Sequence, residues 1–228
     1  MALKYYKVIY ALQDRLTRLI CSIEGDFYLT GGTCLNRFYF KKRFSDDLDF
    51  FYMDSSLFRE WIRETGTAIR ENGFDMTTQI DTRDFVRIMI EKELKIDMVN
   101  DRVYRLGKTI KTADGIKLDN VENILANKLT AIVGRDEPKD VFDFHTIVSC
   151  AVFNWKEILD AVKLKCVFEN DALLARLRSF PVAMLDRLSV TDSCNIEDIK
   201  TGIGRAVNSM ITGGLNKPWD IASSKDEL

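Results

Sequence analysis

The hydrophobic pattern changes its period along the chain and divides it into a mixed half and a helical half. Apolar residues three and four positions apart predict a helix over 3–24. Short apolar runs bounded by turn residues predict strands. Ser55 is the expected N-cap of a further helix that ends at Asn72-Gly73. The predicted strands cover 27–30, 47–53, 74–81, 85–91 and 94–99.

From Asn120 onward the pattern is almost wholly helical. Between the halves, 101–118 is polar and carries Gly107 and Gly115, which predicts a loop or hairpin. We therefore expect an α+β fold in which a mixed β-sheet with flanking helices, over 1–119, precedes a helical bundle, over 120–228, that packs on it. The helices predicted for the second half cover 121–133, 140–151, 155–166, 171–178, 182–188 and 196–211.

Composition excludes several classes of protein. Hydrophobic residues make up 46% of the chain and charged residues 30%, which is typical of a globular protein. The net charge of −2 argues against a strongly basic nucleic-acid coat, so any RNA contact would be a local patch. No apolar run approaches the roughly 18 residues of a membrane span, and the start lacks the order of a signal peptide.

The cysteines indicate a reducing compartment. Five are scattered along the chain with no Cys-x-x-Cys pair, which is typical of free thiols in a cytoplasmic protein. With His145 as the single histidine, a structural zinc site is not expected. The terminal Lys225-Asp226-Glu227-Leu228 spells a retrieval signal that is read only in the endoplasmic reticulum, and we interpret it as a coincidence.

Two carboxylates separated by one residue follow a glycine turn. Gly31 and Gly32 come directly after a predicted strand, and Asp47 and Asp49 begin the next. Residues i and i+2 of a strand point to the same side, so the two acids converge. Converging carboxylates are typical ligands of Mg²⁺, and glycines let a backbone approach a triphosphate. This pattern predicts metal-assisted nucleotidyl transfer.

A third acid is available on another strand. Alternation over 94–99 places Asp97 on the face opposite the main apolar one. If that strand lies beside 47–53, three carboxylates meet, and two metal ions ~3.5–4 Å apart would serve the attacking hydroxyl and the leaving pyrophosphate. The alternative is a solvated acidic strand edge.

Three charged residues of the helical half occupy unusual positions. Lys128 falls at the margin of an apolar helix face, where it either extends to solvent or binds phosphate. Asp140 is either a helix-start residue or part of a site. Asp143 lies on a partly apolar face and needs a partner, for which Lys128 and Arg135 are the candidates.

Together these motifs resemble the AbiEii/AbiGii family of nucleotidyltransferase toxins, a branch of the polymerase-β-like nucleotidyltransferase superfamily. The family pattern joins the glycine turn to Arg-x-Ser-x-Asp-Leu-Asp, matched here from Arg43 to Asp49. A helical Lys-Leu-x-Ala follows, matched from Lys128 to Ala131, and then an Arg, a Pro and a basic-Asp-x-x-Asp step, matched from Arg135 to Asp143. The basic residue of that step is Lys139, where the family more often has arginine.

The resemblance implies a nucleotidyltransferase-like core that transfers a nucleoside monophosphate from an NTP, with Mg²⁺ or Mn²⁺, to an acceptor. For the family, that acceptor is RNA, at the tRNA 3′ end, and the toxin is paired with an antitoxin. The implied roles are metal binding by Asp47 and Asp49, phosphate contact by Lys128, and completion of the site by Asp140 or Asp143. Asp97 is added as a third metal ligand by the strand alternation alone. Gly31, Gly32 and Thr33 would contact the triphosphate, while Arg43 and Ser45 would brace the acidic strand.

Two other functions stay open. The same chemistry would serve a small hydroxylated acceptor such as an antibiotic, and a non-catalytic binding module would keep the fold without turnover. Lys41, Lys42, Arg83 and Arg87 either offer RNA phosphates a basic surface or are ordinary solvated charges.

Overall fold

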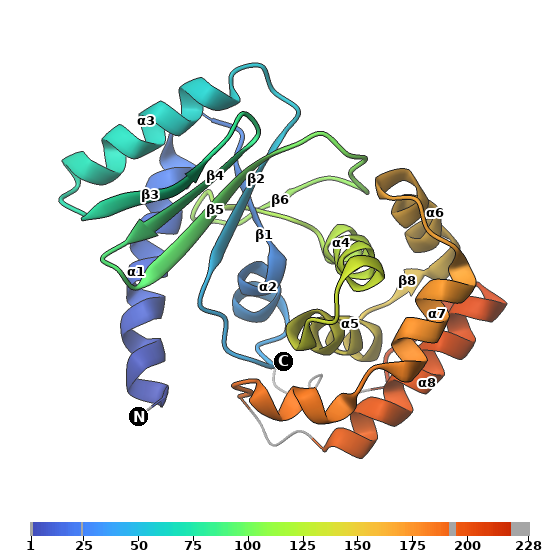
Figure 1. The fold of residues 1–228 in the computed structure, drawn as a ribbon. Helices are drawn as coiled ribbons and strands as arrows, with labels where there is room; N and C mark the ends of the chain where they lie inside the picture. Colours follow the sequence, from blue (N-terminus) through green and yellow to red (C-terminus); the bar gives the residue numbers. More distant parts are fainter. Residues whose placement is uncertain (1, 24, 192–194, 220–228) are drawn as a thin grey trace. The chain divides into compact units, whose positions relative to one another are not determined.

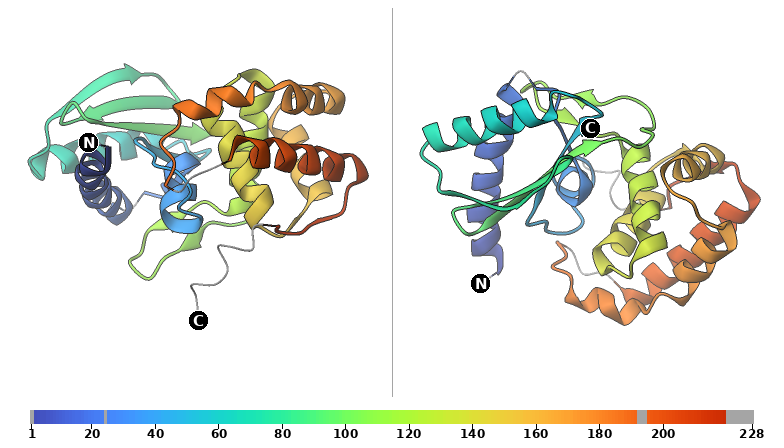
Figure 2. Two further views of the ribbon diagram at one scale, coloured as in Figure 1. Left: turned by 90° about the horizontal axis from the view of Figure 1, so that it is seen from below. Right: turned by 45° about the horizontal axis from the view of Figure 1, so that its top comes forward.

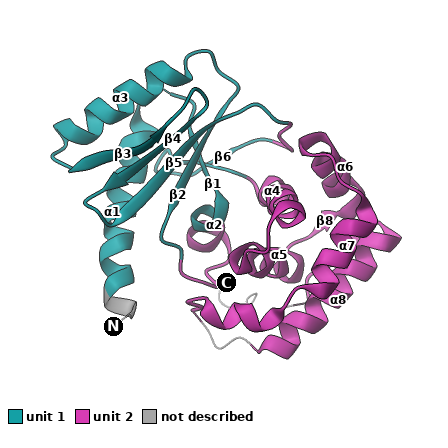
Figure 3. Ribbon diagram, in the orientation of Figure 1, with its two compact units in different colours: residues 1–34, 45–103, 108–119 teal, residues 35–44, 104–107, 120–228 magenta. Residues whose placement is uncertain are grey.

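The structure is a computed structural model that describes residues 2–23, 25–191 and 195–219 (Figure 1). Two compact units alternate along the chain (Figure 3). The first comprises residues 1–34, 45–103 and 108–119, and the second comprises 35–44, 104–107 and 120–228. One border therefore falls between Asp119 and Asn120, and two short earlier segments belong to the second unit.

The first unit is built on a mixed seven-stranded sheet with the order β3-β4-β5-β2-β1-β7-β6. The pairs β2–β5 and β1–β7 are parallel and the others are antiparallel. All five predicted strands are confirmed, and the polar stretch before residue 119 forms the short β6–β7 hairpin. The strands are β1 Tyr28–Thr30, β2 Leu48–Met53, β3 Met76–Asp81, β4 Phe85–Ile90, β5 Leu94–Asp101, β6 Ile110–Lys111 and β7 Lys117–Leu118.

Helices α1 (Ala2–Ser22) and α3 (Phe58–Glu71) contact each other and pack on this sheet (Figure 2). Their face of the sheet is apolar, because Leu48, Phe50 and Tyr52 alternate toward it and are buried. The ring of Phe27 joins the two layers, with its centroid 5.1 Å from that of Tyr52 and 6.3 Å from that of Phe58. The intervening residues of β2 therefore face the opposite side.

One predicted helix start is wrong. Ser55 is not an N-cap, since α3 begins at Phe58 with Leu57 in the cap position. The Ser55 hydroxyl oxygen instead accepts a hydrogen bond from the backbone N–H of Leu57 at 3.0 Å, which makes a turn before the helix. The predicted end is confirmed, since Asn72 is the C-cap and Gly73 has a φ of +81°.

The second unit is mainly helical, as predicted. Helices α4 and α5 pack on each other, and α6, α7 and α8 each contact at least one of them. Large apolar side chains such as Leu129, Phe144 and Trp155 fill the core. The predicted helix at 182–188 is a 3₁₀ helix. The elements are the π-helical turn η1 Leu35–Tyr39, α4 Val121–Gly134, α5 Pro138–Cys150, β8 Phe153–Asn154, α6 Trp155–Lys165, α7 Asn170–Ser179, η2 Val182–Arg187, α8 Ile196–Thr212 and β9 Leu215–Asn216.

Within the described residues, no helix has both the length and the apolar character needed to cross a bilayer. Cys21, Cys34, Cys150 and Cys166 are reduced and form no disulfide. Cys194 and the terminal tetrapeptide Lys225-Asp226-Glu227-Leu228 lie outside the described residues.

Candidate active site

A row of polar residues crosses four neighbouring strands of the first unit. Arg87 on β4 is the register partner of Asp97 on β5, and Asp97 is the register partner of Asp49 on β2. Asp49 in turn lies opposite Thr30 on β1. Partners in one register share a face of the sheet, so these side chains lie on the face away from α1 and α3. The strand that carries Asp97 thus lies beside β2, as the hypothesis of three converging carboxylates requires.

The glycine turn lies against the second acid. Helix α2 (Gly31–Cys34) starts directly after β1, and Gly31 has a φ of +70°. A Cβ added at Gly31 would lie 3.1 Å from Cγ of Asp49, and its carboxylate oxygen would be closer still. Glycine is therefore required here twice, for its left-handed conformation and for the space that the Asp49 carboxylate fills.

Hydrogen bonds join the glycine turn to the segment before β2. The buried Thr33 hydroxyl donates to the backbone carbonyl of Asp47 and lies 2.8 Å from the Ser45 hydroxyl. The Ser45 carbonyl accepts from the Gln13 side chain at 3.0 Å. These contacts fit the bracing role predicted for Ser45, and they use the Thr33 hydroxyl that the resemblance assigned to a triphosphate.

Two basic residues are paired with the acids. The Arg87 guanidinium donates two hydrogen bonds to the Asp97 carboxylate, from Nε and from Nη2, each at 2.7 Å. Lys95 Nζ lies 2.8 Å from Asp47 Oδ2. The hydrogen bonds to Asp97 raise the pKa of Arg87, and the charges of Asp97, Asp47 and Asp49 act in the same direction despite partial burial. All three acids therefore lie in the field of one guanidinium.

The donor chemistry fits a hard divalent cation, but the carboxylates are engaged otherwise. Asp47, Asp49 and Asp97 offer only oxygen ligands, as Mg²⁺ and Mn²⁺ prefer. Among the described residues, no group of three or more His, Cys, Asp or Glu side chains is arranged to hold a metal ion. A metal ion would therefore share Asp47 with Lys95 and Asp97 with Arg87, or displace these cations.

The second unit contains a buried network of charges around α4 and α5. Lys128 is 7% exposed, and its Nζ lies 2.9 Å from Asp140 Oδ1 and 2.6 Å from Asp143 Oδ2. Arg43 donates two hydrogen bonds of 2.7 Å to Asp143, and Arg135 donates to Asp140 at 2.8 Å. Lys128 therefore does not extend to solvent, and Asp140 is more than a helix-start residue.

The electrostatics of this network follow from its geometry. Burial by itself would raise the pKa of Asp143, but the charges of Arg43 and Lys128 outweigh it and lower the pKa to about 2. Burial would likewise lower the pKa of Lys128, but the charges of Asp143 and Asp140 raise it. Both partners stay charged at neutral pH.

The network differs in detail from the sequence expectations. Asp143 has the partner predicted in Lys128, whereas Arg135 pairs with Asp140 instead. Arg43 directs its guanidinium to Asp143 and to the Phe44 carbonyl. The sequence motifs do not identify Lys95, although alternation places it two residues before Asp97 on the same face. Arg87, for which a solvated and an RNA-binding role are both open from the sequence, pairs with Asp97.

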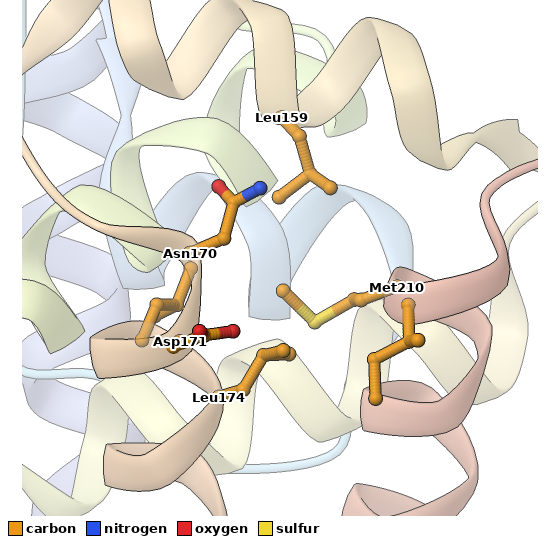
Figure 4. Close-up of a pocket in the computed structure, with 7 residues that line it drawn as sticks. Leu159, Asn170, Asp171, Leu174 and Met210 are labelled. Atoms are coloured by element: carbon orange, nitrogen blue, oxygen red, sulfur yellow. The ribbon is translucent and has the colours of Figure 1, made fainter.

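The second unit also holds a small cavity of about 190 Å³ between α6, α7 and α8, shown in Figure 4. Leu159, Leu174 and Met210 form its apolar wall, and Asn170 and Asp171 supply the polar groups. It has no basic side chain, and its one charge is negative, so it does not suit a triphosphate.

Comparisons with known proteins identify the family. A family profile described as "Nucleotidyl transferase AbiEii toxin, Type IV TA system" matches residues 16–200. A search of curated protein sequences finds no match. JHP933 from Helicobacter pylori is similar in structure, with a TM-score of 0.56 and 20% identity over 87% of this chain and 90% of that one.

MenT4, a nucleotidyltransferase toxin from Mycobacterium tuberculosis, shares the fold as well, with a TM-score of 0.55 and 15% identity. The match covers 91% of this chain and 84% of that one. At these identities the two structures support the fold, and the family profile, which spans most of the chain, supports the activity. The chain therefore belongs to the AbiEii family of nucleotidyltransferase toxins.

Proposed function

We propose that this nucleotidyltransferase transfers a nucleoside monophosphate from an NTP to RNA, at the 3′ end of tRNA, and that the reaction requires Mg²⁺ or Mn²⁺. The observation that carries the proposal is the shared register of Asp49 and Asp97 on neighbouring parallel strands, with the glycine turn against Asp49. Two acids and the glycine turn, whose backbone a triphosphate could approach closely, therefore lie on one face of one sheet.

Asp47, Asp49 and Asp97 would hold the metal ion. A bound divalent cation polarises phosphoryl oxygens and stabilises the charge that develops on the leaving pyrophosphate. Gly31 and Gly32 would let the triphosphate approach the backbone at the start of α2, where the helix dipole favours negative charge. Thr33 and Ser45 would hold Asp47 beside this turn through the hydrogen bonds already described.

The charged network of the second unit has a proposed role in nucleotide use. Lys128, with Asp140 and Asp143 around it, matches the family motif, and we propose that Lys128 contacts nucleotide phosphates. Asp143 would hold both Lys128 and Arg43 in place, because it bonds to each of them. Asp140 would do the same for Lys128 and Arg135.

We also propose that the protein acts in the cytoplasm and is controlled by a cognate antitoxin. The reduced cysteines Cys21, Cys34, Cys150 and Cys166 are consistent with a reducing compartment. The description of the matching family as part of a type IV toxin–antitoxin system supports the proposal that an antitoxin controls this protein.

Labelled nucleotides test the proposal. The purified protein is incubated with each of the four α-labelled NTPs, with either total tRNA or a mixture of aminoglycosides, in Mg²⁺, Mn²⁺ or EDTA. We expect label in tRNA, at the 3′ end, only when a divalent cation is present. Label on an aminoglycoside alone would favour the small-molecule alternative, and transfer in EDTA would refute metal dependence.

A further inference from the structure

We propose that Arg87 and Lys95 are built-in counter-cations that compete with the divalent metal ion for Asp97 and Asp47. In the nucleotide-free protein they occupy the carboxylates, and the metal site is completed when phosphate groups of the NTP accept the guanidinium and the ammonium. The inference rests on the proposed metal site and adds its regulation by substrate.

The geometry of the ion pairs supports this competition. The Arg87 guanidinium donates to both oxygens of Asp97, so a metal ion that binds that carboxylate meets a competing cation at either oxygen. Lys95 competes at one oxygen of Asp47, Oδ2, which lies 2.8 Å from its Nζ. Both basic residues belong to the strands that carry the acids or pair with them, β4 and β5, so the pairs are built into the sheet.

Charge explains why the metal-free protein needs these cations. Asp47, Asp49 and Asp97 lie close enough that all three act on Arg87. Like charges at this spacing repel, and the Asp97 side chain is only 12% exposed, so solvent screens it poorly. Arg87 and Lys95 reduce the formal charge of the group from −3 to −1.

A nucleotide can release both cations. A triphosphate offers oxygens that accept a guanidinium bidentately, as a carboxylate does, and an ammonium binds phosphate as a point charge. Arg87 and Lys95 are partly exposed, with 31% and 27% of their side chains accessible, so they can turn toward a ligand. The proposed triphosphate position at Gly31 lies beside Asp49, which shares a register with Asp97.

Manganese binding to the nucleotide-free protein tests the inference. The free Mn²⁺ signal in electron paramagnetic resonance is titrated with wild type, Arg87→Gln, Lys95→Gln and the control Arg102→Gln, whose residue pairs with Asp84 and Asp54 away from the acids. We expect each of the first two variants to bind Mn²⁺ roughly tenfold more tightly or better, since one competing charge-assisted contact is gone. Arg87→Lys, which keeps the charge but loses the bidentate geometry, should fall between.

Combining each variant with Asp49→Asn distinguishes a failure of the proposed competition from a failure of the proposed metal site. If Asp49→Asn removes Mn²⁺ binding but wild type and Arg87→Gln bind equally, the metal site stands and the competition is refuted. If Asp49→Asn changes nothing in any background, both are refuted. A purely structural role for Arg87 predicts a lower melting temperature without tighter Mn²⁺ binding. Should Arg87→Gln fail to fold, Lys95→Gln applies the same test to the Lys95–Asp47 pair, whose carboxylate is more exposed than that of Asp97.

Discussion

The carboxylate of Asp49 lies directly against Gly31, so close that a Cβ at position 31 would be 3.1 Å from Asp49 Cγ. The contact joins the glycine turn, which we propose receives the triphosphate, to an acid that we propose binds the metal. A change at either residue is therefore expected to disturb the other.

Gly31→Ala should destabilise the protein and abolish nucleotidyl transfer. The left-handed φ of +70° costs an alanine about 1–2 kcal/mol, and the collision with Asp49 adds to it. Gly73→Ala is the matched control, because Gly73 has a φ of +81° with no atom within 4 Å of an added Cβ. Urea unfolding should show a larger loss for Gly31→Ala, and equal losses would mean that the collision is relieved.

Asp47→Asn and Asp49→Asn should each lower the rate of transfer by roughly 10²-fold or more, because metal binding needs the charge. The fold should be retained, since asparagine is isosteric and fewer like charges repel. Asp114→Asn, at an exposed hairpin position, is the control. Transfer is measured with labelled NTP, and melting by circular dichroism. Wild-type turnover in either variant would contradict the metal assignment.

Lys128→Met should destabilise the second unit by about 3–5 kcal/mol, because it leaves the buried carboxylates of Asp140 and Asp143 without one of their cations. The KM for NTP should rise as well if Lys128 contacts phosphate. Lys163→Met, on an exposed part of α6, should change neither quantity. An unchanged KM in a folded Lys128→Met protein would limit Lys128 to a structural role.

The low pKa of Asp143 makes the free energy of unfolding depend on pH. This pKa is about 2 in the folded protein, against an ordinary 3.8, so its contribution to stability is fully present above pH 4 and is lost as the pH falls toward 2. The contribution amounts to about 2 kcal/mol. We expect the stability difference between wild type and Asp143→Asn to shrink by about this amount between pH 6 and pH 2. Urea unfolding across that range measures it, and a constant difference would contradict the pKa.

Thr65→Val should stabilise the first unit by about 1 kcal/mol. The Thr65 hydroxyl, on α3, is buried and has no hydrogen-bond partner among the described residues, so valine removes an unsatisfied polar group without changing the shape. Thr30→Val is the matched comparison and should lower the stability, because the Thr30 hydroxyl donates a hydrogen bond of 2.7 Å to the buried Asp119. Melting temperatures of the two variants should move in opposite directions.

The local pattern predicted most elements because their cause is local. Alternating residues such as Leu48, Phe50 and Tyr52 can bury one face only as a strand, and Asn72-Gly73 can end a helix without its neighbours. Ser55 was misplaced because a serine hydroxyl caps a turn as readily as a helix, and the first helical residue is fixed by Phe58 packing on Phe27.

The amino-acid sequence by itself determined the α+β class, the glycine turn, the acid pair and the family motifs, since each depends on residues close together along the chain. Only the tertiary structure decided which charges meet. Arg87 and Asp97 are ten residues apart and Arg43 and Asp143 are one hundred apart, and their pairing depends on strand register and helix packing. At Asp143 the charges of Arg43 and Lys128 then outweigh burial and keep the carboxylate ionised, because the energy of a charge depends on its distance from other charges and from water.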